Sequence, residues 1–118
     1  MSDVIDMGNG FSVANTEPLG GGKIDCPNGY TISIIWHFGA YSSVGREGVP
    51  FHATDDPRWS VEAGAYVTHT EDWVRVPGIN DDDDVAGWLS IDALREFVTY
   101  VANLPPVIDS GKSLQIEA

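Results

Sequence analysis

The chain has 118 residues and a mass of 12.7 kDa, and its 42% hydrophobic residues can build the core of one domain spanning residues 1–118. Six Lys and Arg stand against eighteen Asp and Glu, so the formal net charge is −12. This charge argues against electrostatic binding of DNA or RNA and against adsorption on an anionic membrane, because those surfaces are themselves negative. It leaves open the binding of a basic protein.

The cysteine content and the hydropathy pattern indicate a compartment. Cys26 is the single cysteine, which excludes an internal disulfide framework and fits a reducing cytoplasm. The first ten residues, MSDVIDMGNG, contain early acids and no basic segment, unlike a secretory signal. The apolar run at 32–38 is far shorter than the roughly 20 residues that cross a bilayer. We therefore expect a cytoplasmic protein without a membrane segment.

The N-terminal third predicts a hairpin, a loop and one long strand. Asn9-Gly10 lies between two short apolar runs, an arrangement that favours a hairpin turn. Residues 18–23 are rich in glycine and are predicted to form a flexible loop. A turn at 27–29 precedes residues 30–38, where β-branched and aromatic side chains predict a strand. The alternation of that strand fades near Trp36, where we expect both faces to be buried.

Residues 39–58 form a long segment without a sustained hydrophobic period. Loops of this length are uncommon in small domains and are usually binding elements or disordered. Tyr41, Arg46 and Phe51 lie in this segment, and Tyr and Arg are over-represented at protein interfaces. We therefore expect it to bind a partner, and the alternative is a loop that only packs or moves.

The C-terminal half predicts two strands, an acidic run and a helix. Residues 59–67 alternate as a half-buried strand does, and a turn at 69–72 precedes a short strand at 73–76. The acidic run at 80–84 is predicted to be a solvated turn. Ser90 is a suitable N-cap for the following helix, whose apolar stripe consists of Leu94, Phe97, Val98, Val101 and Leu104.

Pro105-Pro106 ends the helix, and residues 107–118 either add an edge strand or fray. The four Trp lie in or beside the predicted elements, so most are expected in the core. The helix must bury its stripe against the sheet. The predicted fold is α+β, with a small antiparallel β-sheet of four to five strands packed by one C-terminal helix.

No motif predicts catalysis, a cofactor or a metal. An EF-hand calcium loop beginning at Asp81 would place Ala86 and Asp92 where Gly and Glu are required. The glycines before Lys23 lack the spacing and the Ser or Thr of a phosphate-binding loop. The three His and Cys26 are too far apart in the sequence for a recognised zinc motif. We therefore assign no catalytic residue, no metal ligand and no cofactor.

The acidic charge is concentrated in the second half of the chain. Residues 1–60 contain seven acids and three bases, whereas residues 61–118 contain eleven acids and three bases. The excess gathers at Glu71-Asp72 and at the run Asp81–Asp84. If these lie close together, they form a negative face that takes the place of phosphates on a nucleic-acid-binding protein. The alternative is that acidity only keeps a small protein soluble.

Three segments resemble a loosely defined set of small phage and prophage proteins of unassigned function. They are Asn28-Gly29-Tyr30-Thr31-Ile32-Ser33-Ile34-Ile35, Ser60-Val61-Glu62-Ala63 and Asp83-Asp84-Val85-Ala86-Gly87-Trp88-Leu89-Ser90. The chain departs from that set in its longer 39–58 segment and in its tail after Leu104. The resemblance implies a phage origin, hence a bacterial host cytoplasm, and structural roles such as packing for Trp88. It implies no catalytic residues and no particular partner.

These observations lead to the expectation of a non-enzymatic phage accessory protein that binds and inhibits or modulates a basic host protein. A defence nuclease, a CRISPR effector or a transcription component would present such a nucleic-acid-binding site. The alternatives are a virion or assembly protein that self-associates, an immunity protein that neutralises a basic toxin, and a protein that sequesters a small molecule. The expected partner-binding residues are Asp81, Asp82, Asp83, Asp84, Glu71, Asp72, Tyr41, Arg46 and Phe51.

Overall fold

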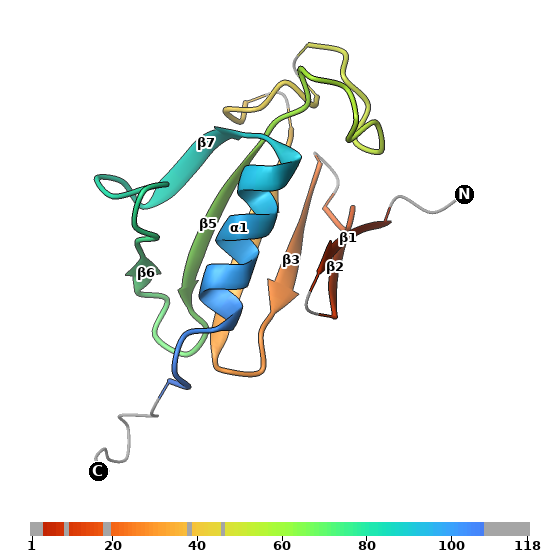
Figure 1. Cartoon of the computed structure of the whole chain (residues 1–118). Helices are drawn as coiled ribbons and strands as arrows, with labels where there is room; N and C mark the ends of the chain where they lie inside the picture. The colour runs from red at the N-terminus through yellow and green to blue at the C-terminus, as the bar shows by residue number, and fades with distance from the viewer. Residues whose placement is uncertain (1–3, 9, 18–19, 38, 46, 108–118) are drawn as a thin grey trace.

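The computed structural model describes residues 4–8, 10–17, 20–37, 39–45 and 47–107 (Figure 1). The first two strands, β1 (Val4–Gly8) and β2 (Phe11–Ala14), form an antiparallel hairpin of their own. Gly8 and Gly10 have φ angles of 82° and 81°, which glycine adopts without a steric penalty. The predicted hairpin is therefore confirmed, while Asn9 lies outside the described residues.

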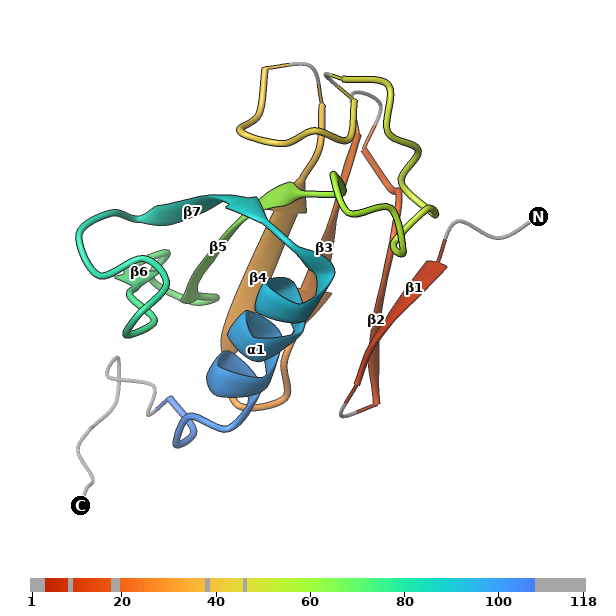
Figure 2. The same cartoon turned by 45° about the horizontal axis from the view of Figure 1, so that its top comes forward.

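The main sheet has five antiparallel strands, namely β3 (Gly21–Asp25), β4 (Tyr30–Ile35), β5 (Val61–Val67), β6 (Trp73–Val74) and β7 (Val85–Leu89). β4 lies between β3 and β5. The other edge of β5 is shared, because β6 pairs with its C-terminal residues Ala65 and Tyr66, while β7 pairs with Val61–Gly64. β7 and β6 therefore lie one after the other along that edge, and Figure 2 shows both next to β5.

Two segments differ from the sequence prediction. Residues 21–23, predicted as part of a flexible loop, belong to β3, where glycine allows close approach: a Cβ on Gly22 would clash with Ala14 and Val13. Residues 85–89, not predicted as a strand, form β7 between the acidic run and the helix. The strand beginning at Tyr30 is shorter than predicted and ends at Ile35.

The single described helix, α1 (Ile91–Ala102), follows the prediction closely. The Ser90 side chain accepts a hydrogen bond from the Ala93 backbone nitrogen at 3.1 Å, as an N-cap does. Its buried residues are Leu94, Phe97, Val98 and Val101. At the other end, the Asn28 side-chain amide donates to the carbonyl oxygens of Val101 and Leu104, at 2.9 and 3.0 Å. This contact ties the β3–β4 turn to the end of the helix.

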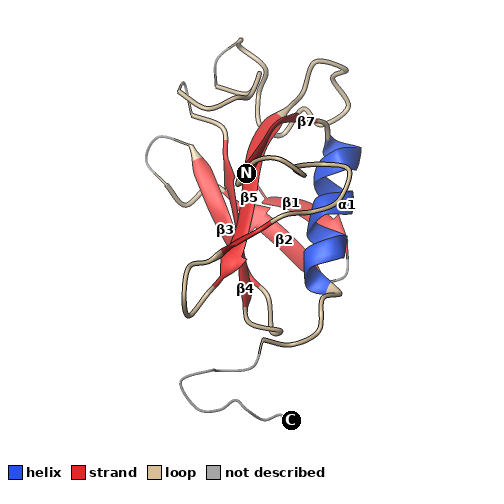
Figure 3. Ribbon diagram, turned by 90° about the vertical axis from the view of Figure 1, so that its left-hand side faces the viewer, coloured by secondary structure: helices blue, strands red, loops and turns tan. Residues whose placement is uncertain are grey.

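The helix covers one face of the sheet, as Figure 3 shows. The core includes the β4 and β5 residues that alternate toward α1, such as Ile32, Ile34, Ala63 and Ala65, all 1% exposed or less. These residues join the helix stripe and the hairpin residue Met7 in one continuous apolar cluster. The α+β class, with an antiparallel sheet packed by one C-terminal helix, is therefore confirmed.

The segment 39–58 is packed onto the domain. Val44 and Val49 are buried and form an isolated bridge. Phe51 stacks on Trp36 with ring centroids 4.0 Å apart, and its carbonyl oxygen accepts a hydrogen bond from Trp59 Nε1 at 2.7 Å. The described parts of this loop thus contribute to the core.

Two of the four Trp depart from the expectation that most are core residues. Trp36 and Trp59 are 5% and 2% exposed, but Trp73 and Trp88 are 46% and 51% exposed. Trp88 has a φ of 57° at an irregularity of β7, and this local geometry turns its side chain outward. Trp88 is therefore not a core residue, and its ring packs against Tyr41 at the surface.

Candidate functional site

The face of the sheet turned away from α1 is not covered by any helix or strand of the described residues. We call it the open face; it consists of Lys23, Asp25, Thr31, Ser33, Ile35, Glu62, Gly64, Tyr66, Trp73 and Val85, which pair across the strands. Directly paired residues of antiparallel strands point to the same side of a sheet. The assignment therefore follows from the register alone.

One cross-strand row of the open face carries its aromatic side chains. Asp25 pairs with Thr31, Thr31 with Tyr66, and Tyr66 with Trp73. The Thr31 hydroxyl donates to Asp25 Oδ1 at 3.0 Å and lies 2.6 Å from the Thr68 hydroxyl, so it is satisfied beneath the rings. The Tyr66 and Trp73 rings are 5.5 Å apart and meet edge to face at 75°.

A small cavity of about 260 Å³ opens beside these rings. We call it the notch; it is lined by Tyr66, Glu71 and Trp73. Glu71 lies in the β5–β6 turn, where its backbone nitrogen donates to the Val67 carbonyl at 2.6 Å. Its φ of 65° is in the left-handed region, which residues other than glycine rarely adopt. The notch thus joins two aromatic rings to a carboxylate on a strained turn.

A second exposed aromatic pair lies at the opposite end of β5. Tyr41 and Trp88 are 56% and 51% exposed, with ring centroids 6.3 Å apart. The Tyr41 backbone nitrogen donates to Glu62 Oε1 at 2.8 Å, and the Trp88 nitrogen donates to the Tyr41 carbonyl at 2.8 Å. These bonds hold Tyr41 against β7 and at the border of the open face.

The acidic run lies in the connection between β6 and β7, residues 75–84, which we call the acidic loop. Its centre is Asn80, which is 4% exposed. Asn80 Oδ1 accepts from the Val76 nitrogen at 2.7 Å, and Nδ2 donates to the Asp83 carbonyl at 3.0 Å. A buried amide therefore organises a loop whose carboxylates point outward.

The four carboxylates of the acidic loop have different local roles. Asp81 accepts from the Gly78 nitrogen at 3.0 Å, and Asp83 accepts from the Asp84 nitrogen at 2.7 Å. Asp84 pairs with Arg75 at 3.2 Å, with both side chains about half exposed. Among the described residues, Asp82 alone of the four has no hydrogen bond or ion pair through its carboxylate. It is the acid most available to a partner.

The structure places the predicted binding residues in separate environments. Glu71 and Asp72 lie in the turn before β6 and the Asp81–Asp84 run lies in the loop after it, so both adjoin the strand that carries Trp73. Tyr41 lies at the far end of β5. Phe51 is half-buried on Trp36 and is placed as a packing residue. Arg46 lies outside the described residues.

Sequence reasoning missed Tyr66 and Trp73 as site residues. The alternation in residues 59–67 had placed Tyr66 opposite the apolar face of its strand, which was the available signal. Trp73 was not singled out, because most of the four Trp are expected in the core. Its exposure follows from pairing beside Tyr66 on a face that lacks a second layer, which the sequence pattern does not reveal.

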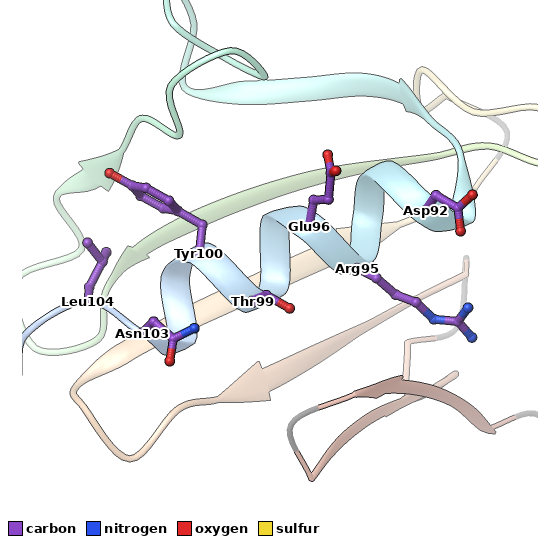
Figure 4. A pocket seen from close by; sticks show the side chains of 7 residues that line it. All are labelled: Asp92, Arg95, Glu96, Thr99, Tyr100, Asn103 and Leu104. Carbon is purple, nitrogen blue, oxygen red and sulfur yellow. The ribbon is translucent and has the colours of Figure 1, made fainter.

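Another cavity, of about 570 Å³, lies along the outer surface of α1 (Figure 4). It is lined by Asp92, Arg95, Glu96, Thr99, Tyr100, Asn103 and Leu104, most of them on the helix itself. Arg95 Nε donates to the Asp6 carbonyl at 3.1 Å, which ties this surface to β1. The lining comes from one local segment of the chain, so it is a shallow depression with no converging set of polar groups.

Two titratable groups outside the open face have shifted pKa values. Burial raises the pKa of the Cys26 thiol, and the adjacent Asp25 carboxylate raises it further. Hydrogen bonds from the Arg58 side chain and backbone lower the pKa of the half-buried Asp56 carboxyl. In the described part of the chain, no group of three or more His, Cys, Asp or Glu side chains is placed to hold a metal ion.

Comparisons with known proteins identify no relative. No family model, no curated protein and no solved structure matches the chain. No helix within the described ranges has the length and apolar character needed to cross a bilayer. The fold and the surface therefore define the class by themselves: a small α+β protein with one helix-covered face and one open face that carries aromatic and acidic side chains.

Proposed function

We propose that this chain is a binding protein whose open face and acidic loop recognise a basic protein. The single observation that carries the proposal is Trp73, a large aromatic side chain 46% exposed on a sheet face, bordered by Glu71 on one side and the acidic loop on the other. Exposed Trp and Tyr side chains are the residue types that most often dominate binding energy at interfaces.

The charge around Trp73 selects the partner. Glu71 and Asp72 precede β6, Asp81–Asp84 follow it, and Glu62 and Asp25 lie on the open face. The bases nearby are Lys23, on the open face, and Arg75, whose guanidinium is paired with Asp84. Complementary charge increases the association rate and selects against acidic partners. A basic protein therefore fits this surface better than a neutral one.

The finer form of the proposal is an accessory protein of phage type that binds a host protein at its nucleic-acid-binding site. Support for this form comes from the acidic net charge of −12 and from the sequence resemblance. In this form the carboxylates of the acidic loop take positions that phosphates occupy on the partner, and the chain acts by binding and not by catalysis. Self-association is the competing use of the same exposed face.

The test is a pull-down from bacterial lysate with the tagged chain at low and at high salt, with bound proteins identified by mass spectrometry. The variant is Trp73→Ala, and the matched control is Tyr100→Ala, an exposed aromatic on α1 that is 40% exposed. We expect one basic protein, retained at low salt, weakened at high salt and lost with Trp73→Ala only. Equal loss in both variants, or capture of acidic proteins, would contradict the proposal.

A second arm tests the acidic contribution. Asp82→Asn removes a carboxylate that makes no hydrogen bond or ion pair among the described residues, and Glu96→Gln on α1 is its control for a general loss of charge. We expect Asp82→Asn to reduce the association rate and its salt dependence, with little change in dissociation. Recovery of the chain itself in a defined multiple, with no other protein, would favour self-association.

A further inference from the structure

We infer that the notch is a binding site for an alkylammonium group, which in the proposed function is the side chain of a lysine on the basic partner. The inference deepens the proposed function and rests on it for the identity of the partner. It rests independently on the three residues that line one cavity: the aromatic residues Tyr66 and Trp73 and the acidic residue Glu71.

The rings supply the first part of the argument. Trp and Tyr faces attract cations that lie within about 6 Å of the ring centroid, and Trp is the strongest of the aromatic side chains. The Tyr66 and Trp73 centroids are 5.5 Å apart and their planes are inclined by 75°. Two nearly perpendicular rings form a corner, so a cation beside them lies close to both.

The Glu71 carboxylate supplies the second part. Glu71 lines the same cavity as Tyr66 and Trp73, and a carboxylate beside the rings adds direct charge attraction to their weaker pull on a cation. The nearest Arg along the chain, Arg75, is engaged elsewhere, because its guanidinium is held 3.2 Å from Asp84 Oδ1 and 3.2 Å from the Asp81 carbonyl. Arg75 is therefore occupied by the acidic loop.

The shape of the corner favours an ammonium over a guanidinium. A guanidinium is planar and stacks parallel to one ring, or binds a carboxylate through two parallel hydrogen bonds. A lysine ammonium is a compact charge on a flexible apolar stem, and it fits an angle between two rings beside one carboxylate. The cavity of about 260 Å³ is of a size for one side chain and not for a larger ligand.

The backbone of the turn gives a further indication. Glu71 has a φ of 65°, and it keeps this conformation although glycine would adopt it without strain. Hydrogen bonds between Val67 and residues 71 and 72 close the turn in both directions, at 2.6 and 2.8 Å. The strained residue is thus the one that brings a carboxylate to the notch.

The experiment uses single-side-chain probes and the full chain. N-acetyl-lysine methylamide is titrated into isotope-labelled protein while the Tyr66 and Trp73 ring signals are followed by NMR. The N-acetyl-norleucine and N-acetyl-arginine methylamides serve as the neutral and planar comparisons at matched ionic strength. We expect lysine to bind about two- to five-fold more tightly than norleucine, the range for a cation at an exposed aromatic site. Equal binding of norleucine and lysine, or tighter binding of arginine, would overturn the inference.

Two variants locate the site. Trp73→Leu keeps an apolar side chain over the sheet but removes the ring face, and Glu71→Gln keeps the turn but removes the charge. Each should reduce lysine binding about two- to five-fold toward the norleucine level, while Glu96→Gln on α1, far from the notch, should not. Unchanged lysine binding in Trp73→Leu would overturn the inference.

Failure of the notch and failure of the proposed function are distinguishable. Selective lysine binding without capture of a basic protein would support the notch as an ammonium-binding site and refute the proposed function. If the chain captures a basic protein in a Trp73-dependent manner but binds lysine and norleucine equally, the notch is not an ammonium-binding site and the proposed function stands.

Discussion

The indole of Trp73 lies over Gly64, so close that a Cβ atom at position 64 would be 2.8 Å from Trp73 Cζ3. The same Cβ would be 3.1 Å from Val85 Cγ1 and 3.3 Å from the Asp84 carbonyl oxygen. The exposed Trp73 ring thus packs directly on the backbone of Gly64, on the open face of the sheet. Because Gly64 in β5 has no side chain, the Trp73 ring of β6 can occupy this position.

Gly64→Ala is predicted to displace the Trp73 ring. The added methyl group has no space unless the ring moves, so we expect a loss of about 1–3 kcal/mol in the free energy of unfolding, as for overpacked positions. The Tyr66–Trp73 geometry should change at the same time and lysine binding should fall. Urea denaturation and NMR of the indole signals measure the two effects.

The control is Gly39→Ala, because a Cβ on Gly39 meets only the His37 ring at 3.5 Å, an ordinary contact distance. This variant should leave the indole signal of Trp73 unchanged. A Gly64→Ala protein with wild-type stability and an unshifted Trp73 signal would show that the close approach of the ring does not exist in solution.

The sequence was sufficient for the part of the fold in which local pattern and tertiary burial agree. The Ser90 cap, the helix stripe from Leu94 to Val101 and the alternation of β5 are all short-range signals, and each is confirmed. The last predicted stripe residue, Leu104, lies beyond the end of the helix and is only half-buried. β3 and β7 were missed because their glycines carry no hydrophobic period. Their strand conformation comes from pairing with β4 and β5, which is a tertiary effect.

The candidate site was predictable only in its charge. The acids at 71–72 and 81–84 were identified from the sequence, because runs of carboxylates are usually solvated. The aromatic part was not, because the alternation placed Tyr66 on the face opposite the apolar one without showing that this face is open, and most Trp were expected in the core; the register places Tyr66 and Trp73 together on the face away from α1. The sequence does not show which face of a sheet lacks a covering layer.

The backbone of Glu71 predicts opposite effects on stability and binding. Glu71→Gly removes a left-handed conformation that costs other residues roughly 1–2 kcal/mol, so the free energy of unfolding should rise by up to about 1 kcal/mol after the greater flexibility of the unfolded chain is included. Lysine binding should fall because the carboxylate is lost. Thermal or urea unfolding and the NMR titration measure the two changes separately.

Glu71→Gln is the matched comparison, since it keeps the backbone strain and loses only the charge. Its stability should stay within about 0.5 kcal/mol of the wild type, as is usual for surface substitutions, while its lysine binding falls as in Glu71→Gly. A decrease in stability for Glu71→Gly would show that the side chain of Glu71 stabilises the turn, against this prediction.

The interaction between Asp56 and Arg58 in the 39–58 loop is expected to make a pH-dependent contribution to stability. The Arg58 hydrogen bonds at 2.9 and 3.2 Å lower its pKa below the ordinary value of 3.8. A lowered folded-state pKa contributes stability above the unfolded-state value, and this contribution is lost as the pH falls through the folded-state pKa. Carboxyl-carbon NMR should show Asp56 titrating below 3.8 in the folded chain.

Arg58→Gln separates the two sources of that shift. The side-chain contacts are lost, but the backbone nitrogen of residue 58 still donates to Asp56 Oδ1 at 2.9 Å. The Asp56 pKa should therefore rise part of the way toward its ordinary value. A pKa that does not move in Arg58→Gln would show that the ion pair at 2.9 Å is not populated in solution.

The hydrogen bonds of the buried Asn80 amide indicate that this one side chain holds the acidic loop in its conformation. Asn80→Ala removes the acceptor for the Val76 nitrogen and the donor to the Asp83 carbonyl, and the buried Val76 nitrogen would lose its partner. We expect a loss of about 1–3 kcal/mol in the free energy of unfolding and faster amide exchange in residues 76–84. Asp82→Asn, which breaks no contact among the described residues, should change neither. The loop positions the carboxylates beside β6, so Asn80→Ala should also weaken capture of a basic protein, although it removes no charge. Undiminished capture would show that the charge of the loop matters for binding and that its conformation does not.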